Sequence, residues 1–239
     1  CSDSASLTVD VINPQAGTDV TICAEDSVQL QADGGVSYLW NNAGTLSNPN
    51  IPDPVAFPLV TTDYIVTVTD SAGCVDVDTV TVFVNQLPPA DAGPDTAICI
   101  GDTIQISASG GIGYQWLVTD SMDNPFLADP SLNPTMTTTY IVSVTDANFC
   151  VQVDSMVLTV NALPLAEAGP DVTKCGEDSI QLQASGGLIY SWNPPLDLSD
   201  PLIADPMAEP DSNRTYTVTV IDGNGCVNTD SLFIQTMYA

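Results

Sequence analysis

Histidine and basic residues are almost missing from this 239-residue chain. Lys174 is its one lysine, Arg214 is its one arginine, and it has no histidine, against 30 acidic residues and a net charge of −28. Nucleic-acid-binding proteins contact phosphates through Lys and Arg, so this composition excludes nucleic acid as a partner. Without histidine the chain cannot build a Ser-His or Cys-His nucleophile pair.

Two further patterns are absent. No C-x-x-C pair occurs, which together with the lack of histidine argues against a zinc site. No apolar run approaches the roughly 18 residues that a membrane-spanning helix needs, so we expect no direct membrane insertion. We therefore expect a protein that is not an enzyme, with no catalytic or cofactor-binding residues. Hydrophobic residues make up 44% of the chain, which indicates folded domains despite the charge.

A repeat of 76 residues organises the whole chain. The spacing separates the three tryptophans, two sets of three cysteines and one set of three tyrosines: Trp40, Trp116 and Trp192; Cys23, Cys99 and Cys175; Cys74, Cys150 and Cys226; Tyr64, Tyr140 and Tyr216. Such self-similarity indicates tandem structural units. We place repeat 1 at residues 13–87, repeat 2 at 88–163 and repeat 3 at 164–239, after a truncated preceding repeat at 1–12.

Each repeat is patterned as short β-strands. In repeat 1, "SVQLQA", "SYLW" and "TDYIVTVTD" alternate apolar and polar residues and are bounded by Gly, Asn, Asp and Pro. This pattern is typical of strands and hairpins, and the Pro-rich stretch before Tyr64 predicts an edge strand or an extended loop. About seven strands with a central Trp predict an all-β, Ig-like sandwich. Three such domains joined by short Pro-bearing linkers would form a semi-rigid rod.

The last strand of each repeat changes phase. Val75 and Val77 occupy odd positions, whereas Val80, Val82 and Val84 occupy even ones. Because a one-residue slip moves side chains to the other face of a sheet, we expect a β-bulge near residues 78–79 and, in repeat 2, near residues 154–155.

Several segments resemble a known class of repeats. "AGPDTAICIGDTIQISASGG", "YQW", "TTTYIVSVTDANFC" and "DSMVLTV" are similar to the PKD-like/Ig-like repeats of giant Bacteroidota cell-surface adhesins and filaments, which include gliding-motility adhesins exported by the type IX secretion system. The resemblance covers essentially the whole chain. It implies an extracellular, cell-surface location and a role in adhesion or surface structure.

The extracellular location that the resemblance implies, together with seven cysteines, favours disulfides. The simplest pairing lies within each repeat: Cys23–Cys74, Cys99–Cys150 and Cys175–Cys226, with Cys1 unpaired. In an Ig-like topology, however, the two cysteines of a repeat would lie about 20 Å apart, beyond the reach of a disulfide. Bonds between neighbouring repeats, Cys23–Cys150 and Cys99–Cys226, therefore remain the alternative.

Five aspartate positions also recur every 76 residues. They are Asp19, Asp95 and Asp171; Asp26, Asp102 and Asp178; Asp53, Asp129 and Asp205; Asp70, Asp146 and Asp222; Asp78, Asp154 and Asp230. Turn and cap hydrogen bonds explain such residues most simply. The competing hypothesis is Ca²⁺ bound by carboxylates at the junctions between repeats, with Asp95, Asp171, Asp146 and Asp222 as candidate ligands.

The resemblance also suggests glycosylation, because Bacteroidota O-glycosylate Ser or Thr in D-[ST]-[AILVMT] contexts. The candidate residues are Ser27, Thr79, Thr103, Ser155, Ser179 and Ser231. The alternative is that Asp-Ser and Asp-Thr simply begin strands.

The tryptophans could stack on sugars or pack in the core, and their fixed spacing on a predicted inner strand favours the core. We expect a structural rod or stalk segment of a bacterial surface filament or adhesin. The alternative is a carbohydrate- or surface-binding array with contacts in the Pro-rich loops. The expected partners are other repeats of the same polypeptide or filament, and glycans or surfaces. "CSDSASLTVDV" matches "CVDVDTVTVFV", so Cys1 would begin the last strand of a preceding repeat.

Overall fold

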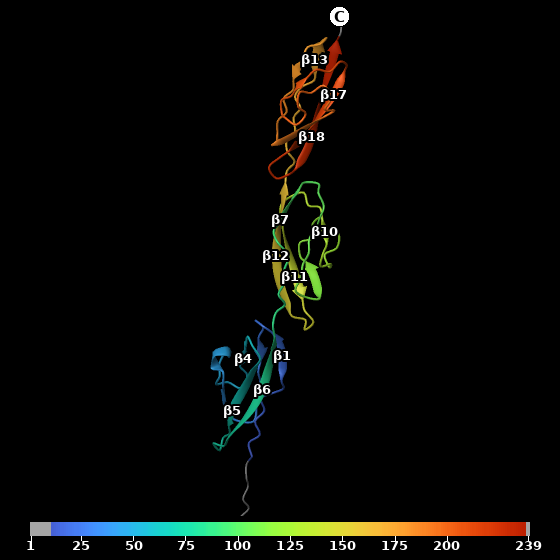
Figure 1. Cartoon of the computed structure of the whole chain (residues 1–239). Coiled ribbons are helices and arrows are strands. Elements are labelled where there is room, and N and C mark those ends of the chain that lie inside the picture. Colours follow the sequence, from blue (N-terminus) through green and yellow to red (C-terminus); the bar gives the residue numbers. More distant parts are fainter. Residues whose placement is uncertain (1–10, 238–239) are drawn as a thin grey trace, which may run out of the picture. The chain divides into compact units, whose positions relative to one another are not determined.

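The computed structural model describes residues 11–237 as an almost purely β protein (Figure 1). Repeat 1 holds β1 Val20–Cys23, β2 Val28–Gln29, β3 Ser37–Trp40, a short 3₁₀ helix at Ala43–Thr45, β4 Val55–Ala56, β5 Thr62–Thr69 and β6 Val75–Asn85. Repeat 2 holds β7 Thr96–Cys99, β8 Ile104–Gln105, β9 Gly113–Trp116, β10 Ser131–Leu132, β11 Thr138–Thr145 and β12 Val151–Asn161. Repeat 3 holds β13 Val172–Cys175, β14 Ile180–Gln181, β15 Ile189–Asn193, β16 Met207–Ala208, β17 Arg214–Ile221 and β18 Val227–Met237.

Every repeat builds the same two sheets. In repeat 1 the large sheet has the strand order β1-β6-β5-β3 and the small sheet pairs β2 with β4. β1 runs parallel to β6, whereas β5 runs antiparallel to both β6 and β3. The orders β7-β12-β11-β9 and β13-β18-β17-β15 reproduce this arrangement in repeats 2 and 3. The expected all-β, Ig-like sandwich is confirmed, with six named strands in each repeat where we expected about seven.

Each sandwich closes over a core made by the alternating strands. In repeat 1, Tyr64, Val66 and Val68 of β5 are fully buried and pack with Trp40 and Val82. The Pro-rich stretch forms β4 and an extended segment, in which the carbonyls of Pro52 and Pro54 accept hydrogen bonds from the backbone after β2. For β3 and β5 the sequence pattern therefore predicted both the strand and the face that it buries.

The predicted β-bulges are wrong. The β5–β6 register stays constant from Thr62↔Val82 to Thr69↔Val75, and exposure alternates without a break along β12. The inward face of β6 simply contains aspartate at position 78, while Val75 and Val77 point to solvent. The Asp78 carboxylate is tolerated there because it accepts the Ala16 N–H at 2.7 Å.

A glycine in each repeat lets the preceding linker approach closely. Gly110 has φ +103°, and a Cβ on it would lie 2.0 Å from the carbonyl oxygen of Pro89. Gly186 and Gly34 also have positive φ, and a Cβ on them would meet the carbonyl oxygens of Leu165 and Asn13 in the same way. Only glycine adopts this backbone conformation without strain and leaves this space, so the linker backbone packs directly on the turn.

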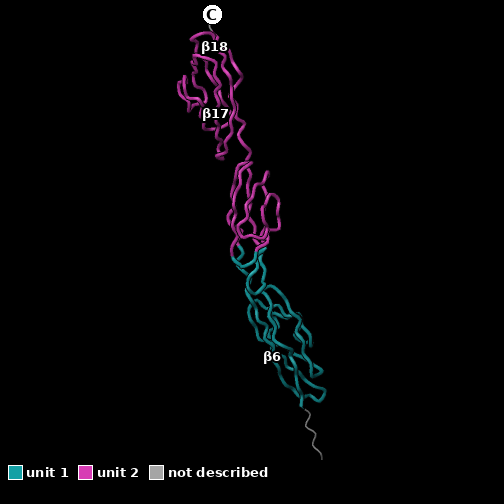
Figure 2. Tube along the Cα trace, turned by 90° about the vertical axis from the view of Figure 1, so that its right-hand side faces the viewer, with its two compact units in different colours: residues 1–90, 110–113, 143–152 teal, residues 91–109, 114–142, 153–239 magenta. Residues whose placement is uncertain are grey.

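The chain divides into two compact units (Figure 2). Unit 1 comprises Cys1–Ala90 with Gly110–Gly113 and Ser143–Gln152, and unit 2 comprises Asp91–Ser109, Tyr114–Val142 and Val153–Ala239. Two turns of repeat 2 therefore belong to the unit that contains repeat 1. Each sheet lies inside one 76-residue repeat, whereas the exact domain boundaries at 13–87, 88–163 and 164–239 stay a prediction.

Candidate functional site

The two disulfides join successive repeats. Cys23 is bonded to Cys150 and Cys99 to Cys226, with Cα–Cα distances of 5.6 and 5.5 Å and a sequence separation of 127 residues in both cases. Each bond lies within one compact unit. The first cysteine always comes from the first strand of a repeat, and the second always comes from the hairpin before the last strand of the next repeat.

The intradomain pairing Cys23–Cys74, Cys99–Cys150 and Cys175–Cys226 is therefore wrong. Cys23 ends β1 beside Asn85, the last residue of β6, whereas Cys74 directly precedes the first residue of β6. An 11-residue strand rises about 3.3 Å per residue, so the two cysteines lie roughly 30 Å apart. That distance exceeds the reach of a disulfide several-fold.

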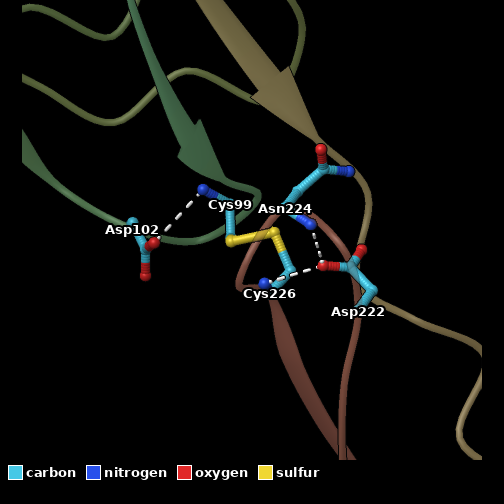
Figure 3. The surroundings of a disulfide bond; sticks show 5 residues. All are labelled: Cys99, Asp102, Asp222, Asn224 and Cys226. Atoms are coloured by element: carbon cyan, nitrogen blue, oxygen red, sulfur yellow. Dashed lines mark hydrogen bonds between the residues drawn. A yellow bond between two sulfur atoms is a disulfide. The ribbon is translucent and has the colours of Figure 1, made fainter. Parts of the chain in front are cut away.

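The first-strand cysteine is positioned by a tight turn. The N–H of Asp26 donates to the carbonyl of Cys23 at 3.1 Å. The N–H of Ala24, the residue directly after Cys23, donates to the carbonyl of Asn85 at 2.8 Å. In repeat 2, Asp102 donates to the carbonyl of Cys99, and its carboxylate accepts the Cys99 N–H at 3.2 Å (Figure 3). The turn thus fixes the backbone on both sides of the sulfur-bearing residue.

An aspartate shapes the hairpin that presents the second cysteine. Asp222 Oδ1 accepts the N–H groups of Asn224 and Cys226 at 2.8 and 2.9 Å (Figure 3). Its own N–H donates to the carbonyl of Cys226 at 3.0 Å. Asp146 makes the same three hydrogen bonds around Cys150. This arrangement explains why aspartate recurs four residues before each of these cysteines.

The cysteines fall into three groups. Four are disulfide-bonded, of which Cys150 and Cys226 are buried and Cys23 and Cys99 half-buried, whereas Cys74 and Cys175 are exposed free thiols. Cys1 lies outside the described residues. The alternative pairing between neighbouring repeats is confirmed, and it leaves Cys74 and Cys175 free. The signal in the sequence was the length of the last strand, which separates the two cysteines of one repeat.

The four candidate calcium ligands do not form a cluster. Asp146 and Asp222 shape their hairpins, and Asp95 and Asp171 accept the N–H groups of Val157 and Phe233 at 2.7 Å. Within residues 11–237 no group of three or more His, Cys, Asp or Glu is placed to hold a metal ion. These carboxylates have structural partners, and a calcium role for them stays a prediction.

Three other recurring aspartates connect the start of a repeat to its last strand. Asp78, Asp154 and Asp230 accept the N–H groups of Ala16, Ala92 and Ala168 at 2.7–2.8 Å. At Asp230 this hydrogen bond is the largest cause that lowers the carboxyl pKa from its ordinary value, followed by the N–H of Ser231. The charged form is favoured because both donors point at the carboxylate oxygens.

The repeated aromatic residues belong to the cores. Trp40, Trp116 and Trp192 are almost fully buried, and each indole N–H donates to the carbonyl oxygen eleven residues later at 3.0–3.1 Å. Burial is the largest of the causes that raise the pKa of the hydroxyls of Tyr64, Tyr140 and Tyr216. These tryptophans are therefore not platforms for stacking on sugars.

All six candidate glycosylation residues, Ser27, Thr79, Thr103, Ser155, Ser179 and Ser231, are exposed. Ser231 also shares a 2.8 Å hydroxyl–hydroxyl hydrogen bond with Thr217. Attachment of a glycan at Ser231 would replace or rearrange this contact.

Comparisons with known proteins give matches to solved structures alone. No family model matches, and no curated protein sequence matches. The solved structures that match include the I67–I69 I-band fragment of titin, at 13% identity and TM-score 0.40 over 95% of this chain and 97% of that one. The eight N-terminal Ig domains of DSCAM match at 11% and 0.43 over 94% and 36%, and the insect immune protein hemolin matches at 14% and 0.36 over 93% and 74%.

These values are low, so we base no functional argument on the likeness. In the described part of the chain no helix has the length and apolar character needed to cross a bilayer. The chain is a tandem Ig-like β-sandwich protein in which disulfides connect one repeat to the next.

Proposed function

We propose that the chain is a structural stalk segment of an extracellular bacterial cell-surface filament or adhesin, serving surface attachment or motility. One observation carries this proposal: both disulfides of the described residues connect a repeat to its neighbour rather than stapling a single repeat. A disulfide between two repeats stabilises the connection between them, and a stalk that is under tension needs such a connection.

The covalent connectivity suits tension. Along the backbone, 203 residues separate Cys23 from Cys226, but the two disulfides bypass much of that length because Cys99 and Cys150 are only 51 residues apart. A pulled chain would therefore release less length when individual sandwiches unfold.

The disulfides and the negative net charge support an extracellular location. Disulfides persist in oxidising compartments and are rare in reducing ones. A net charge of −28 on 239 residues makes copies repel one another and keeps a long polymer soluble. The motif resemblance to repeats of Bacteroidota adhesins and filaments points to the bacterial surface.

Glycans are a further proposal for this surface. The six exposed Ser and Thr residues of D-[ST] motifs are accessible to a modifying enzyme. The mass of the intact protein from its native source would exceed that of the bare polypeptide by whole sugar units. A mass equal to that of the bare polypeptide would contradict the proposal.

The location can be tested on producing cells. Antibodies raised against the purified chain should label intact, unpermeabilised cells, and immunogold labelling should follow extended structures outside the envelope. Labelling that requires permeabilisation would overturn the proposal. Binding to defined glycans on an array, with affinity lost after substitutions in the Pro-rich loops, would instead favour the carbohydrate-binding alternative.

A further inference from the structure

The two free thiols are the two unmatched halves of the inter-repeat junction. We propose that Cys175 forms a disulfide with the hairpin cysteine of a further repeat of this kind, and Cys74 with the first-strand cysteine of another, and we use a second copy of this chain, which carries both kinds of cysteine, as the probe. Cys175 is the first-strand cysteine of repeat 3, and Cys74 is the hairpin cysteine of repeat 1. Two independent observations support the proposal: the pairing rule of the existing bonds and the local geometry of both halves.

The pairing rule is set by the two disulfides already formed. In both, a first-strand cysteine bonds a hairpin cysteine, and neither bond joins two cysteines of the same kind. Cys23 and Cys99 are the positional equivalents of Cys175, while Cys150 and Cys226 are those of Cys74. Among the described residues, one cysteine of each kind is left, so a second copy offers each thiol the type of partner that its equivalents have.

The hairpin half already has the geometry of its bonded equivalents. Asp70 Oδ1 accepts the N–H groups of Ala72 and Cys74, both at 2.8 Å, and the Asp70 N–H donates to the Cys74 carbonyl at 3.0 Å. The corresponding distances around Cys150 and Cys226 are 2.8, 2.9 and 3.0 Å. The residue before the cysteine has positive φ in all three hairpins: Gly73, Phe149 and Gly225.

The first-strand half matches its bonded equivalents in the ladder but not in the turn that follows. Positive φ falls two residues after the cysteine in the equivalents, at Glu25 and Gly101, and one residue after it in repeat 3, at Gly176. Cys175 pairs with Met237 in the parallel ladder, as Cys23 pairs with Asn85 and Cys99 with Asn161. The N–H of Gly176 donates to Met237 at 2.9 Å, and that of Asp178 donates to the Cys175 carbonyl at 3.2 Å. Formation of the bond would therefore need little rearrangement of the hairpin or of the β13 ladder, and any adjustment falls in the turn at Gly176.

The chemistry requires an oxidant, for which we name a low-molecular-weight disulfide such as oxidised glutathione. The thiolate of one cysteine attacks the glutathione disulfide and releases one reduced glutathione. The thiolate of the other chain then attacks the protein–glutathione disulfide and releases the second. Two thiols thus lose two protons and two electrons, and one oxidised glutathione becomes two reduced molecules. Both protein thiols are exposed, as this exchange requires.

Charge sets the conditions of the experiment. Two copies that each have a net charge of −28 repel one another, and salt screens this repulsion, with a Debye length of roughly 3 Å at 1 M. Head-to-tail coupling should therefore be faster at high salt than at low salt.

The test uses the full chain in a Cys1→Ser background, which removes the seventh cysteine. One variant adds Cys74→Ser and retains the Cys175 thiol, and the other adds Cys175→Ser and retains the Cys74 thiol. Each variant alone, and an equimolar mixture, is incubated with a glutathione redox buffer at high salt. Products are then resolved by non-reducing electrophoresis and intact-mass measurement.

We expect each variant alone to stay monomeric and the mixture to give mixed dimers that contain a Cys74–Cys175 peptide. The Cys1→Ser protein, which retains both thiols, should form a ladder of longer species that collapses on reduction. Homodimers of either variant formed as readily as mixed dimers would show unspecific thiol coupling and overturn the proposal. So would the absence of mixed dimers, or a Cys1→Ser monomer whose two thiols bond to each other.

Mixing under denaturing conditions is the matched control. In about 8 M urea the folded hairpin around Cys74 and the folded first strand around Cys175 are lost. Dimers of two different variants and dimers of one variant should then form in statistical proportion. A preference for mixed dimers that survives in urea would show that the preference does not come from the folded junction.

Discussion

Cys23 is bonded to Cys150, 127 residues away, rather than to Cys74 of its own repeat. The parallel pairing of β1 with β6 causes this choice, because it places Cys23 at the end of β6 that is remote from Cys74. Since Cys99 and Cys226 repeat the relationship, the pairing follows from the fold of the repeat and not from one local feature.

The disulfides should limit how far the chain can be stretched. With both bonds intact, the shortest covalent path from Cys23 to Cys226 runs through the 51 residues between Cys150 and Cys99 instead of 203 residues of backbone. About 150 residues therefore do not contribute to the stretched length while the disulfides are intact, which corresponds to roughly 500 Å at the extended-chain spacing. Single-molecule stretching before and after reduction measures the difference, and equal contour lengths would refute the connectivity.

Removal of one bond should lower thermal stability. The double variant Cys23→Ser/Cys150→Ser opens a 127-residue loop, for which chain entropy sets a ceiling of roughly 5 kcal/mol. We expect the unfolding midpoint of unit 1 to fall by about 10 °C, measured by calorimetry. Cys74→Ser is the control, because it removes an exposed free thiol and should leave the midpoint unchanged. Equal midpoints for wild type and the double variant would contradict the prediction.

Asp230 should make the free energy of unfolding depend on pH in the acidic range. Its folded-state pKa is lowered mainly by the Ala168 N–H, so the stabilisation is fully present above the ordinary carboxyl pKa. It is lost as the pH falls through the lower, folded-state value. In Asp230→Asn we expect a smaller free energy of unfolding at pH 7 and a weaker decline on acidification, measured by urea denaturation between about pH 2 and pH 7.

The control for this titration is Asp205→Asn, at an exposed position with no carboxylate hydrogen bond among those described. It should leave both the stability at neutral pH and its acid dependence close to those of the wild type. A decline in Asp230→Asn as steep as that of the wild type would show that Asp230 is not the group responsible.

Gly110 should be intolerant of a side chain. In Gly110→Ala the new Cβ would lie 2.0 Å from the Pro89 oxygen on a backbone with φ +103°, so the linker must move away from the turn. We expect a loss of about 1–3 kcal/mol in the free energy of unfolding, measured with urea. Gly44→Ala is the matched control, since its Cβ would meet nothing within 4 Å and its φ is not positive. A variant as stable as the control would show that the linker is not packed there.

The sequence determined the repeat, the all-β class and the core. These properties depend on local alternation and on the constant 76-residue spacing, and both can be seen without knowing which strands pair. Trp40 and Tyr64 were assigned to the core for this reason, and both are buried with their polar atoms hydrogen-bonded. The small sheets of two-residue strands, and the six rather than seven strands of each repeat within residues 11–237, were not predictable from alternation alone.

Tertiary structure decided which residues meet. The phase change at Asp78 suggested a bulge because local patterning treats an inward aspartate as an error, but a distant N–H, that of Ala16, compensates its charge. Cysteine pairing likewise depended on strand direction, since β1 parallel to β6 and β1 antiparallel to β6 have the same sequence pattern but place Cys23 at opposite ends of the sheet. Non-local pairing, and not composition or spacing, therefore determined which cysteines are bonded and which remain free.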